Sequence, residues 1–167
     1  MKKIFILGGG GYVGAELVPY LLKKSYHVTV FDLFIFGQNV IKKNKNLKLI
    51  KGDLRNIYLL NKHIVDFDCV IHLACISNDP SFELNPKIGK TINYDYFKPF
   101  IKICKNAGVK RFIYASSSSV YGIQNKKNVT ENIKPKPLTD YSKFKLKCEK
   151  ILIKENSCLY CPFHLFT

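Results

Sequence analysis

The sequence contains no apolar run near the roughly 18 residues that a membrane-spanning helix requires. Its apolar N-terminal stretch runs straight into glycines and lacks the small-residue cleavage site of a signal peptide. We therefore expect a cytoplasmic protein with no membrane partner. Hydrophobic residues make up 47% and charged residues 23% of the 167 residues, a composition typical of a globular domain rather than a disordered chain.

Arginine and acidic residues are both scarce. Arg55 and Arg111 are the only arginines among 27 basic residues, and 12 acidic residues leave a net charge of +15. The lysines are scattered along the chain, whereas a surface that reads nucleic-acid bases favours the bidentate arginine fork. We interpret the charge as solvated surface charge and expect no specific nucleic-acid binding.

The six cysteines lack the second pair that would complete a structural zinc site. Cys158 and Cys161 have a zinc-like spacing, and His164 would add only a third ligand. The other four cysteines stand in apolar segments, as buried free thiols do. We therefore predict no metal site, and no disulfide either, because the sequence has no export signal.

Short apolar runs alternate with helical patterns along the chain. Strands are predicted over residues 3–7, 28–31, 47–50, 69–73, 112–115 and 158–160. Helices are predicted over residues 12–24, 57–64, 84–107 and 139–155, with Pro19 and Pro99 as interior irregularities. This alternation predicts an α/β fold, a Rossmann-type doubly wound parallel sheet of about six strands in one domain over residues 1–167.

A glycine-rich loop, Gly-Gly-Gly-Gly-Tyr-Val-Gly at residues 8–14, follows the first predicted strand and opens the first predicted helix. It fits G-x-G-x-x-G from Gly9 and G-x-x-G-x-x-G from Gly8, so its register stays open. In either register the glycines let a pyrophosphate approach the backbone at the helix N-terminus. We expect a branched side chain at Gly11 to block that approach and also to strain the backbone.

Asp32 ends the second predicted strand, where a carboxylate can accept hydrogen bonds from the hydroxyls of an adenosine ribose. Its charge would repel a 2′-phosphate, so the combination predicts NAD rather than NADP as the cofactor. The alternative interpretation of Asp32 is a turn residue at a strand end.

Tyr141 and Lys145 are four residues apart at the start of a predicted helix, which places both side chains on one face. We expect the ammonium of Lys145 to lower the pKa of Tyr141, so that the phenol exchanges a proton with a substrate hydroxyl near neutral pH. A serine-rich segment at residues 116–122 follows the fifth predicted strand and would bring a hydroxyl to the same place.

The chain resembles the extended short-chain dehydrogenase/reductase family, the NAD-dependent nucleotide-sugar epimerases and dehydratases. The matching segments occur in family order at residues 6–14, 32, 52–55, 72–74, 93, 116–122 and 141–145. The resemblance implies NAD as cofactor, a nucleotide-sugar substrate and hydride transfer at a sugar carbon.

The resemblance also implies a role for individual residues. The pyrophosphate would be held by Gly8, Gly11, Tyr12, Val13 and Gly14. The adenosine would be bordered by Asp32, Asp53 and Leu54, and the cofactor channel by Leu73 and Ala74. Ser117 would orient the substrate, Tyr141 would be the acid/base, and Lys145 would tune Tyr141 and hold the nicotinamide ribose. Core packing alone would also explain Leu54, Leu73 and Ala74, and Asn93 would then only brace the loop after the fifth strand.

The sequence departs from the family pattern in two places. Ser118 and Ser119 stand where the 4,6-dehydratases carry an Asp-Glu pair, which favours epimerase or simple redox chemistry over dehydration. Residues 160–164 lack the usual Arg and Asn, and the sequence stops at Thr167, before the usual C-terminal substrate domain. We therefore expect little nucleotide-sugar turnover by the chain alone. The alternatives are an inactive truncated fragment or a non-catalytic dinucleotide-binding module, dimerising through the predicted helices 84–107 and 139–155.

Overall fold

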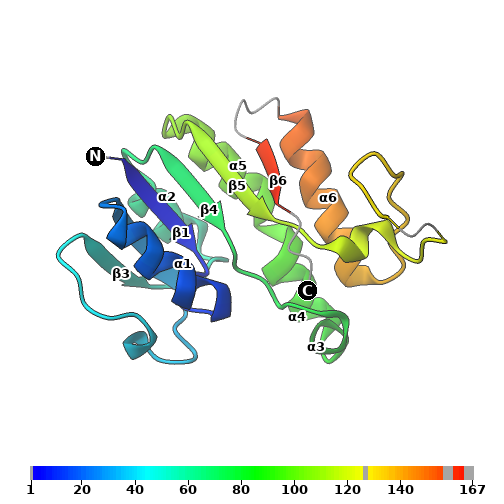
Figure 1. Cartoon of the computed structure of the whole chain (residues 1–167), viewed down its shortest axis with the longest axis horizontal. Helices are drawn as coiled ribbons and strands as arrows, with labels where there is room; N and C mark the ends of the chain where they lie inside the picture. The colour runs from blue at the N-terminus through cyan, green and yellow to red at the C-terminus, as the bar shows by residue number, and fades with distance from the viewer. Residues whose placement is uncertain (1, 126–127, 156–159, 164–167) are drawn as a thin grey trace.

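The computed structural model of the chain describes residues 2–125, 128–155 and 160–163. In this part of the chain, parallel strands form one six-stranded sheet in the order β3-β2-β1-β4-β5-β6 (Figure 1). The strands are β1 (Lys3–Leu7), β2 (His27–Asp32), β3 (Leu47–Lys51), β4 (Cys69–His72), β5 (Arg111–Ala115) and β6 (Tyr160–Phe163). The predicted Rossmann-type doubly wound sheet is thereby confirmed.

The predicted end of the sixth strand is wrong by three residues. It was expected over residues 158–160, of which 158 and 159 lie outside the described residues, whereas β6 runs from Tyr160 and includes Pro162. A proline lacks the N–H that an interior strand needs, but β6 lies at the edge of the described sheet, where proline is tolerated.

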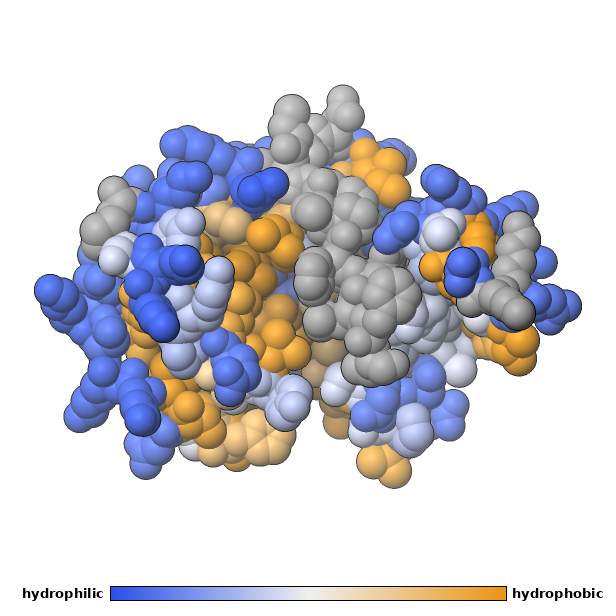
Figure 2. All heavy atoms as spheres, viewed as in Figure 1, coloured by the Kyte–Doolittle hydropathy of each residue, from blue (hydrophilic) through white to orange (hydrophobic). Residues whose placement is uncertain are grey.

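Both faces of the sheet are covered by helices, because the strands are apolar on both sides. The helices α2 (Ile57–His63), α5 (Phe97–Asn106) and α6 (Asp140–Lys154) pack on the face that Phe5 and Leu7 present. The helix α1 (Tyr12–Lys23) packs on the opposite face with Ile4 and Ile6. Figure 2 shows apolar side chains gathered left of the centre of the visible face, with hydrophilic ones along the left and upper border.

The single long helix predicted over residues 84–107 is wrong. The segment contains α4 (Pro86–Lys90), the π-helical turn η2 (Thr91–Asp95) and α5, and a separate short helix, α3 (Asp79–Glu83), precedes it. Pro86 disfavours a helical conformation at Asn85, and the Asn85 side chain instead accepts a hydrogen bond from the N–H of Ile88 and caps α4. Pro99 falls in the first turn of α5, where its missing N–H costs nothing.

The other predicted helices are confirmed within a residue at each end. Thr139 caps α6 through a reciprocal pair of hydrogen bonds with Ser142, and α1 continues through Pro19. None of the helices among the described residues is long and apolar enough to cross a bilayer.

Candidate functional site

The strand order reverses between β1 and β4, and the carboxyl ends of these two strands form the crevice where such sheets bind ligands. Gly8 follows β1 with a φ of +85°, and Ala74 follows β4. A Cβ atom on Gly8 would lie 2.4 Å from the backbone nitrogen of Ala74. The N–H groups of Leu73 and Ala74 both donate to the carbonyl of Leu7, at 2.8 and 3.0 Å. The glycine loop therefore lies directly against the segment after β4.

The glycines of the loop serve different purposes. A Cβ atom on Gly14 would lie 2.1 Å from the carbonyl oxygen of Gly9, so this position admits no side chain while the loop keeps its shape. Gly11 has a φ of −91°, and a Cβ there would meet nothing closer than the carbonyl oxygen of Gly8 at 3.7 Å. The expectation that a side chain at Gly11 strains the backbone is therefore wrong. The fold leaves open space at Gly11 that it does not need for its own packing.

The N-terminus of α1 has free hydrogen-bonding capacity. The first bond of the helix runs from the N–H of Ala15 to the carbonyl of Gly11, so the N–H groups of Tyr12, Val13 and Gly14 precede the helical ladder. No side chain caps Gly11, and the first turn carries no acidic residue. These donors and the positive end of the helix dipole suit a phosphate.

Asp32 lies beside the glycine loop. Its Oδ2 accepts a hydrogen bond from the N–H of Gly10 at 2.9 Å, and its Oδ1 accepts one from the N–H of Phe34 at 2.7 Å. The bond to Phe34 is the strand-end turn that the alternative interpretation expected. Each carboxylate oxygen keeps a further lone pair, so the group can still accept hydrogen bonds from ribose hydroxyls.

Asp53 and Leu54 follow β3 at the same edge of the sheet. The N–H of Gly52 donates to the carbonyl of Asp32 at 2.9 Å, which joins this segment to the end of β2. The guanidinium of Arg55 hydrogen-bonds with Asp53 and holds the pKa of that carboxyl below its usual value. Leu54 is buried in the core, as packing alone would require.

Tyr141 is buried near the start of α6, close to Ser117 at the end of β5. Burial raises the pKa of Tyr141 above its ordinary value, although the charge of Lys145 lowers it. Hydrogen bonding with the Ser117 side chain and with the backbone of Asn78 also lowers it. Lys145 thus lowers the pKa of Tyr141 as expected, but burial outweighs it, and the phenol of the protein alone stays above its ordinary pKa. The cause is desolvation, which the sequence does not reveal.

Lys145 lies on the same face of α6, as the four-residue spacing predicts. Its side chain is 2% exposed, and Nζ donates to the carbonyl of Ala115 at 2.7 Å. The ammonium stands 4.9 Å from the ring centroid of Tyr114 and 5.8 Å from that of Tyr141. A buried cation is therefore fixed beside the phenol at the end of β5.

Ser117 caps the short 3₁₀ helix η3 (Ser118–Tyr121). Its Oγ forms a hydrogen bond of 2.8 Å with the Oγ of Ser119 and accepts one of 3.2 Å from the N–H of Ser119. Ser117 thus links Ser119 to Tyr141. Its hydrogen-bond partner in η3 is the hydroxyl of Ser119, at a position where the 4,6-dehydratases carry a carboxylate.

The loop after β4 completes the cluster, and the sequence did not point to its role. The backbone of Asn78, which has a φ of +72°, reaches Tyr141, and the hydroxyl of Thr139 donates to the carboxylate of Asp79. The side chain of Asn93 forms two hydrogen bonds with the backbone of Ile76 in the same loop. It accepts one from the N–H of Ile76 at 2.8 Å and donates one to the carbonyl of Ile76 at 3.0 Å. Asn93 therefore braces the loop after the fourth strand, and the predicted brace of the loop after the fifth strand is wrong.

A metal has no evident place in the described part of the chain. Within these residues, no three histidine, cysteine, aspartate or glutamate side chains come together as ligands. The zinc-like motif lies largely elsewhere, since Cys158 and His164 are outside the described residues.

Comparison with known proteins decides the family. The sequence profile of the NAD-dependent epimerase/dehydratase family matches residues 4–163. The chain belongs to this family. Its cofactor is NAD, the dinucleotide that the glycine loop and Asp32 predict.

Relatives within the family differ in the reaction that their names describe. The chain is 30% identical over 152 residues to the UDP-glucose 4-epimerase of Lactobacillus helveticus, covering 90% of this chain and 46% of the relative. It is 31% identical over 159 residues to the decarboxylating sterol-4-alpha-carboxylate 3-dehydrogenase of Mus musculus, covering 93% and 41%. The UDP-N-acetylglucosamine 4-epimerase of Methanobrevibacter ruminantium M1, solved in complex with UDP-N-acetylmuramic acid, superposes with a TM-score of 0.86. It is 30% identical, and the match covers 95% of this chain and 52% of that one. The chain thus spans about half the length of the relatives it matches.

Proposed function

We propose that the chain binds NAD in the crevice between β1 and β4 and performs oxidation and reduction at a sugar carbon of a nucleotide sugar. The observation that carries this proposal is the continuity between the two parts of the crevice. Gly8 of the glycine loop lies against Ala74, and the loop that continues from Ala74 reaches Asp79, whose carboxylate accepts a hydrogen bond from the hydroxyl of Thr139 beside Tyr141. A cofactor lying along this path would join the glycine loop to Tyr141.

The proposed roles of the binding residues follow from their positions. The pyrophosphate would lie over the open space at Gly11, against the free N–H groups of Tyr12, Val13 and Gly14. Asp32 would hold the adenosine ribose, and the segment that includes Asp53 and Leu54 would border the adenine. Leu73 and Ala74 would line the channel toward Tyr141.

The proposed chemistry assigns a proton to Tyr141. Bound NAD⁺ would supply the hydride acceptor and a positively charged ring in the crevice. Because burial keeps the pKa of Tyr141 raised, the phenol is protonated at neutral pH in the protein alone. Added positive charge beside it would work in the same direction as Lys145 and favour the phenolate, which then removes the proton of a substrate hydroxyl. Ser117 would hold that hydroxyl in place, and the proton returns by the reverse route.

Epimerase-type chemistry suits this site better than dehydration. Elimination of water needs an acid and a base beyond the tyrosine, and the residues at the relevant positions are Ser118 and Ser119. The Ser119 hydroxyl is engaged by Ser117 and is not acidic near neutral pH. We therefore propose 4-epimerase-type or simple redox chemistry.

The test is turnover of UDP-glucose and UDP-N-acetylglucosamine with added NAD, comparing the parent chain with Tyr141→Phe. General acid–base catalysis contributes about 10²- to 10⁴-fold, so we expect the variant to be slower by at least about 10²-fold. NAD affinity is measured in parallel to show that the variant is intact. Equal turnover by parent and variant would contradict the role of Tyr141. NAD binding without any turnover by the parent would agree with the expectation that the chain alone turns over little nucleotide sugar, and would favour a non-catalytic dinucleotide-binding module.

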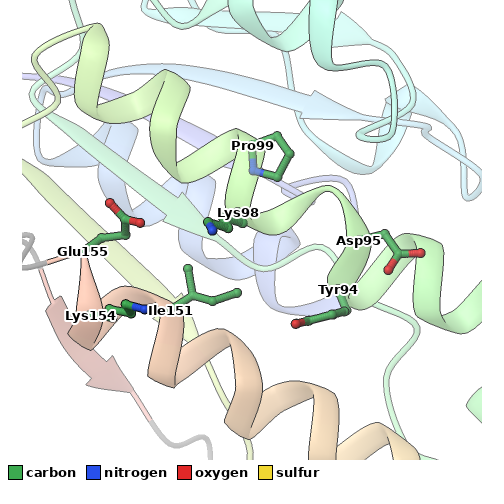
Figure 3. Close-up of a pocket in the computed structure, with 7 residues that line it drawn as sticks. All are labelled: Tyr94, Asp95, Lys98, Pro99, Ile151, Lys154 and Glu155. Atoms are coloured by element: carbon green, nitrogen blue, oxygen red, sulfur yellow. The ribbon is translucent and has the colours of Figure 1, made fainter.

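A homodimer through α5 and α6 is a further part of the proposal. A groove of about 440 Å³ runs between these helices and is lined by Tyr94, Asp95, Lys98, Pro99, Ile151, Lys154 and Glu155 (Figure 3). The lining combines apolar groups with both signs of charge, which suits a two-fold interface that a second copy of the chain would complete. We expect sedimentation to give a dimer that Ile151→Lys dissociates. A monomeric parent would contradict it.

A further inference from the structure

Three side chains from one face of α6 contact three consecutive residues at the end of β5. Tyr141, Lys145 and Glu149 are spaced four residues apart, so they stand above one another on the helix. Tyr141 hydrogen-bonds with Ser117 and Lys145 donates to the carbonyl of Ala115. Glu149 accepts a hydrogen bond through its Oε1 from the hydroxyl of Ser116, the residue between Ala115 and Ser117.

Glu149 is an unusual residue for this position. Its side chain is 8% exposed and Ser116 is 6% exposed, so the carboxyl group has lost most of its contact with water. Burying a carboxyl group is costly unless hydrogen bonds compensate, and glutamate is rarely found in a core. The neighbouring buried residues of α6, Cys148 and Leu152, supply the packing that the core needs. The contact with Ser116 is therefore the feature that distinguishes Glu149.

The charge of Glu149 also acts on a residue that follows Ser117. After burial, the charge of Glu149 is the main cause that raises the pKa of Tyr121, the last residue of η3. Ser116 immediately precedes Ser117, and η3 immediately follows it. Glu149 thus contacts Ser116 and acts electrostatically on Tyr121, which stand on either side of Ser117 in the sequence.

We propose that Glu149 is a positioning residue, which holds Ser116 and thereby sets the Ser117 hydroxyl against Tyr141. Without this anchor, the segment between β5 and η3 loses its link to α6 at Ser116, and the Ser117 hydroxyl moves away from the phenol. The importance of this placement for catalysis rests on the proposed function. The placement itself is a property of the free protein and is testable without cofactor or substrate.

The test is a double-mutant cycle read from the ¹³Cζ resonance of Tyr141 in tyrosine-labelled protein at pH 8, assigned with Tyr141→Phe. Ser117→Ala removes the hydrogen bond that lowers the pKa of Tyr141, so we expect the resonance to shift and the apparent pKa to rise. Glu149→Ala is expected to shift the resonance in the same direction. Ser117→Ala added to Glu149→Ala should then cause little further change, because the hydroxyl has already left the phenol.

Two variants separate positioning from general stability. Glu149→Gln keeps a hydrogen-bond acceptor for Ser116, so we expect it to restore the parent resonance even if the melting temperature falls. Cys104→Ser places a hydroxyl in the core of α5, away from Ser116, and should lower the melting temperature without moving the Tyr141 resonance.

The proposal is overturned if folded Glu149→Ala keeps the parent resonance, or if the effects of Glu149→Ala and Ser117→Ala add in full. Should Glu149→Ala fail to fold, Ser116→Ala takes its place in the cycle with the same expectation. Failure of the proposed function would be distinguished from this result, because the parent would then show no NAD binding or turnover. The Tyr141 resonance would still shift in the variants as described for the double-mutant cycle.

Discussion

The glycine loop and the Tyr141 cluster lie in one crevice but are built in different ways. The loop contributes backbone, because Gly8 and Gly14 admit no side chain and the N-terminus of α1 offers free N–H groups. The Tyr141 cluster contributes buried polar side chains from α6, each matched to an atom at the end of β5. The shape of the loop depends on its own glycines and on backbone contacts such as that of Gly8 with Ala74, whereas the cluster depends on side-chain packing between distant elements. Single substitutions in the two parts should therefore have different effects on stability and on cofactor binding.

The largest effect is expected from Gly14→Ala. Its Cβ would lie 2.1 Å from the carbonyl oxygen of Gly9, a backbone atom that moves only if the loop and the start of α1 move too. We expect a loss of roughly 4 kcal/mol or more in the free energy of unfolding, measured by urea denaturation. Gly37→Ala is the matched control, since its φ is +88° but no atom lies within 4 Å of the added group. That variant should lose about 1–3 kcal/mol, from its backbone conformation alone. Equal losses in the two variants would show that the loop is not tightly packed.

His72 ends β4, between the two parts, and is expected to make stability fall with acid. Burial is the main reason that its pKa is lowered to about 3, while its Nε2 hydrogen-bonds with the hydroxyl of Tyr96. Within the described structure its Nδ1 has no hydrogen-bond partner. Below pH 6.5 His72 binds a proton in the unfolded chain but stays neutral in the folded protein. The free energy of unfolding therefore decreases as the pH falls from 6.5 toward 3. The expected slope is about 1.4 kcal/mol per pH unit.

Urea denaturation between pH 7 and pH 4 measures this slope. His72→Phe keeps an aromatic ring among Phe97, Phe112 and Tyr114 but cannot take up a proton. Its stability should change less with pH than that of the parent. Identical slopes would mean that His72 is not the responsible group.

The contrast between the glycine loop and the Tyr141 cluster also explains how much of each could be predicted from the sequence. The strands, the glycine loop and the Tyr141–Lys145 spacing were predictable, because each depends on residues close together in sequence. The apolar pattern of residues 84–107 suggested one helix, because the capping by Asn85 and the π-helical turn become evident only in the folded chain. The roles of Asn78 and Glu149 require contacts between distant elements. The direction of the Tyr141 pKa shift depends on burial, which no spacing reveals.

A smaller effect is expected of Asp32 on the ratio of the affinities for NAD and NADP. Asp32 is fixed by the N–H groups of Gly10 and Phe34, so its carboxylate cannot easily turn away from a 2′-phosphate. We expect calorimetry to give at least about tenfold tighter binding of NAD, equivalent to about 1.4 kcal/mol. Asp32→Asn, which keeps the size and a hydrogen-bond acceptor, should narrow that difference. An unchanged ratio in the variant would assign the selectivity to another group.

The most direct test of the proposed cofactor site is calorimetry of NAD binding by Gly11→Val. The fold has open space at Gly11, so the variant should lose no more than about 1 kcal/mol of stability, mainly from replacing a favourable helix N-cap. The same side chain would occupy the place proposed for the pyrophosphate. We therefore expect a folded protein with NAD affinity reduced by at least about 100-fold, or about 2.7 kcal/mol. A folded Gly11→Val variant that binds NAD as tightly as the parent would contradict the account.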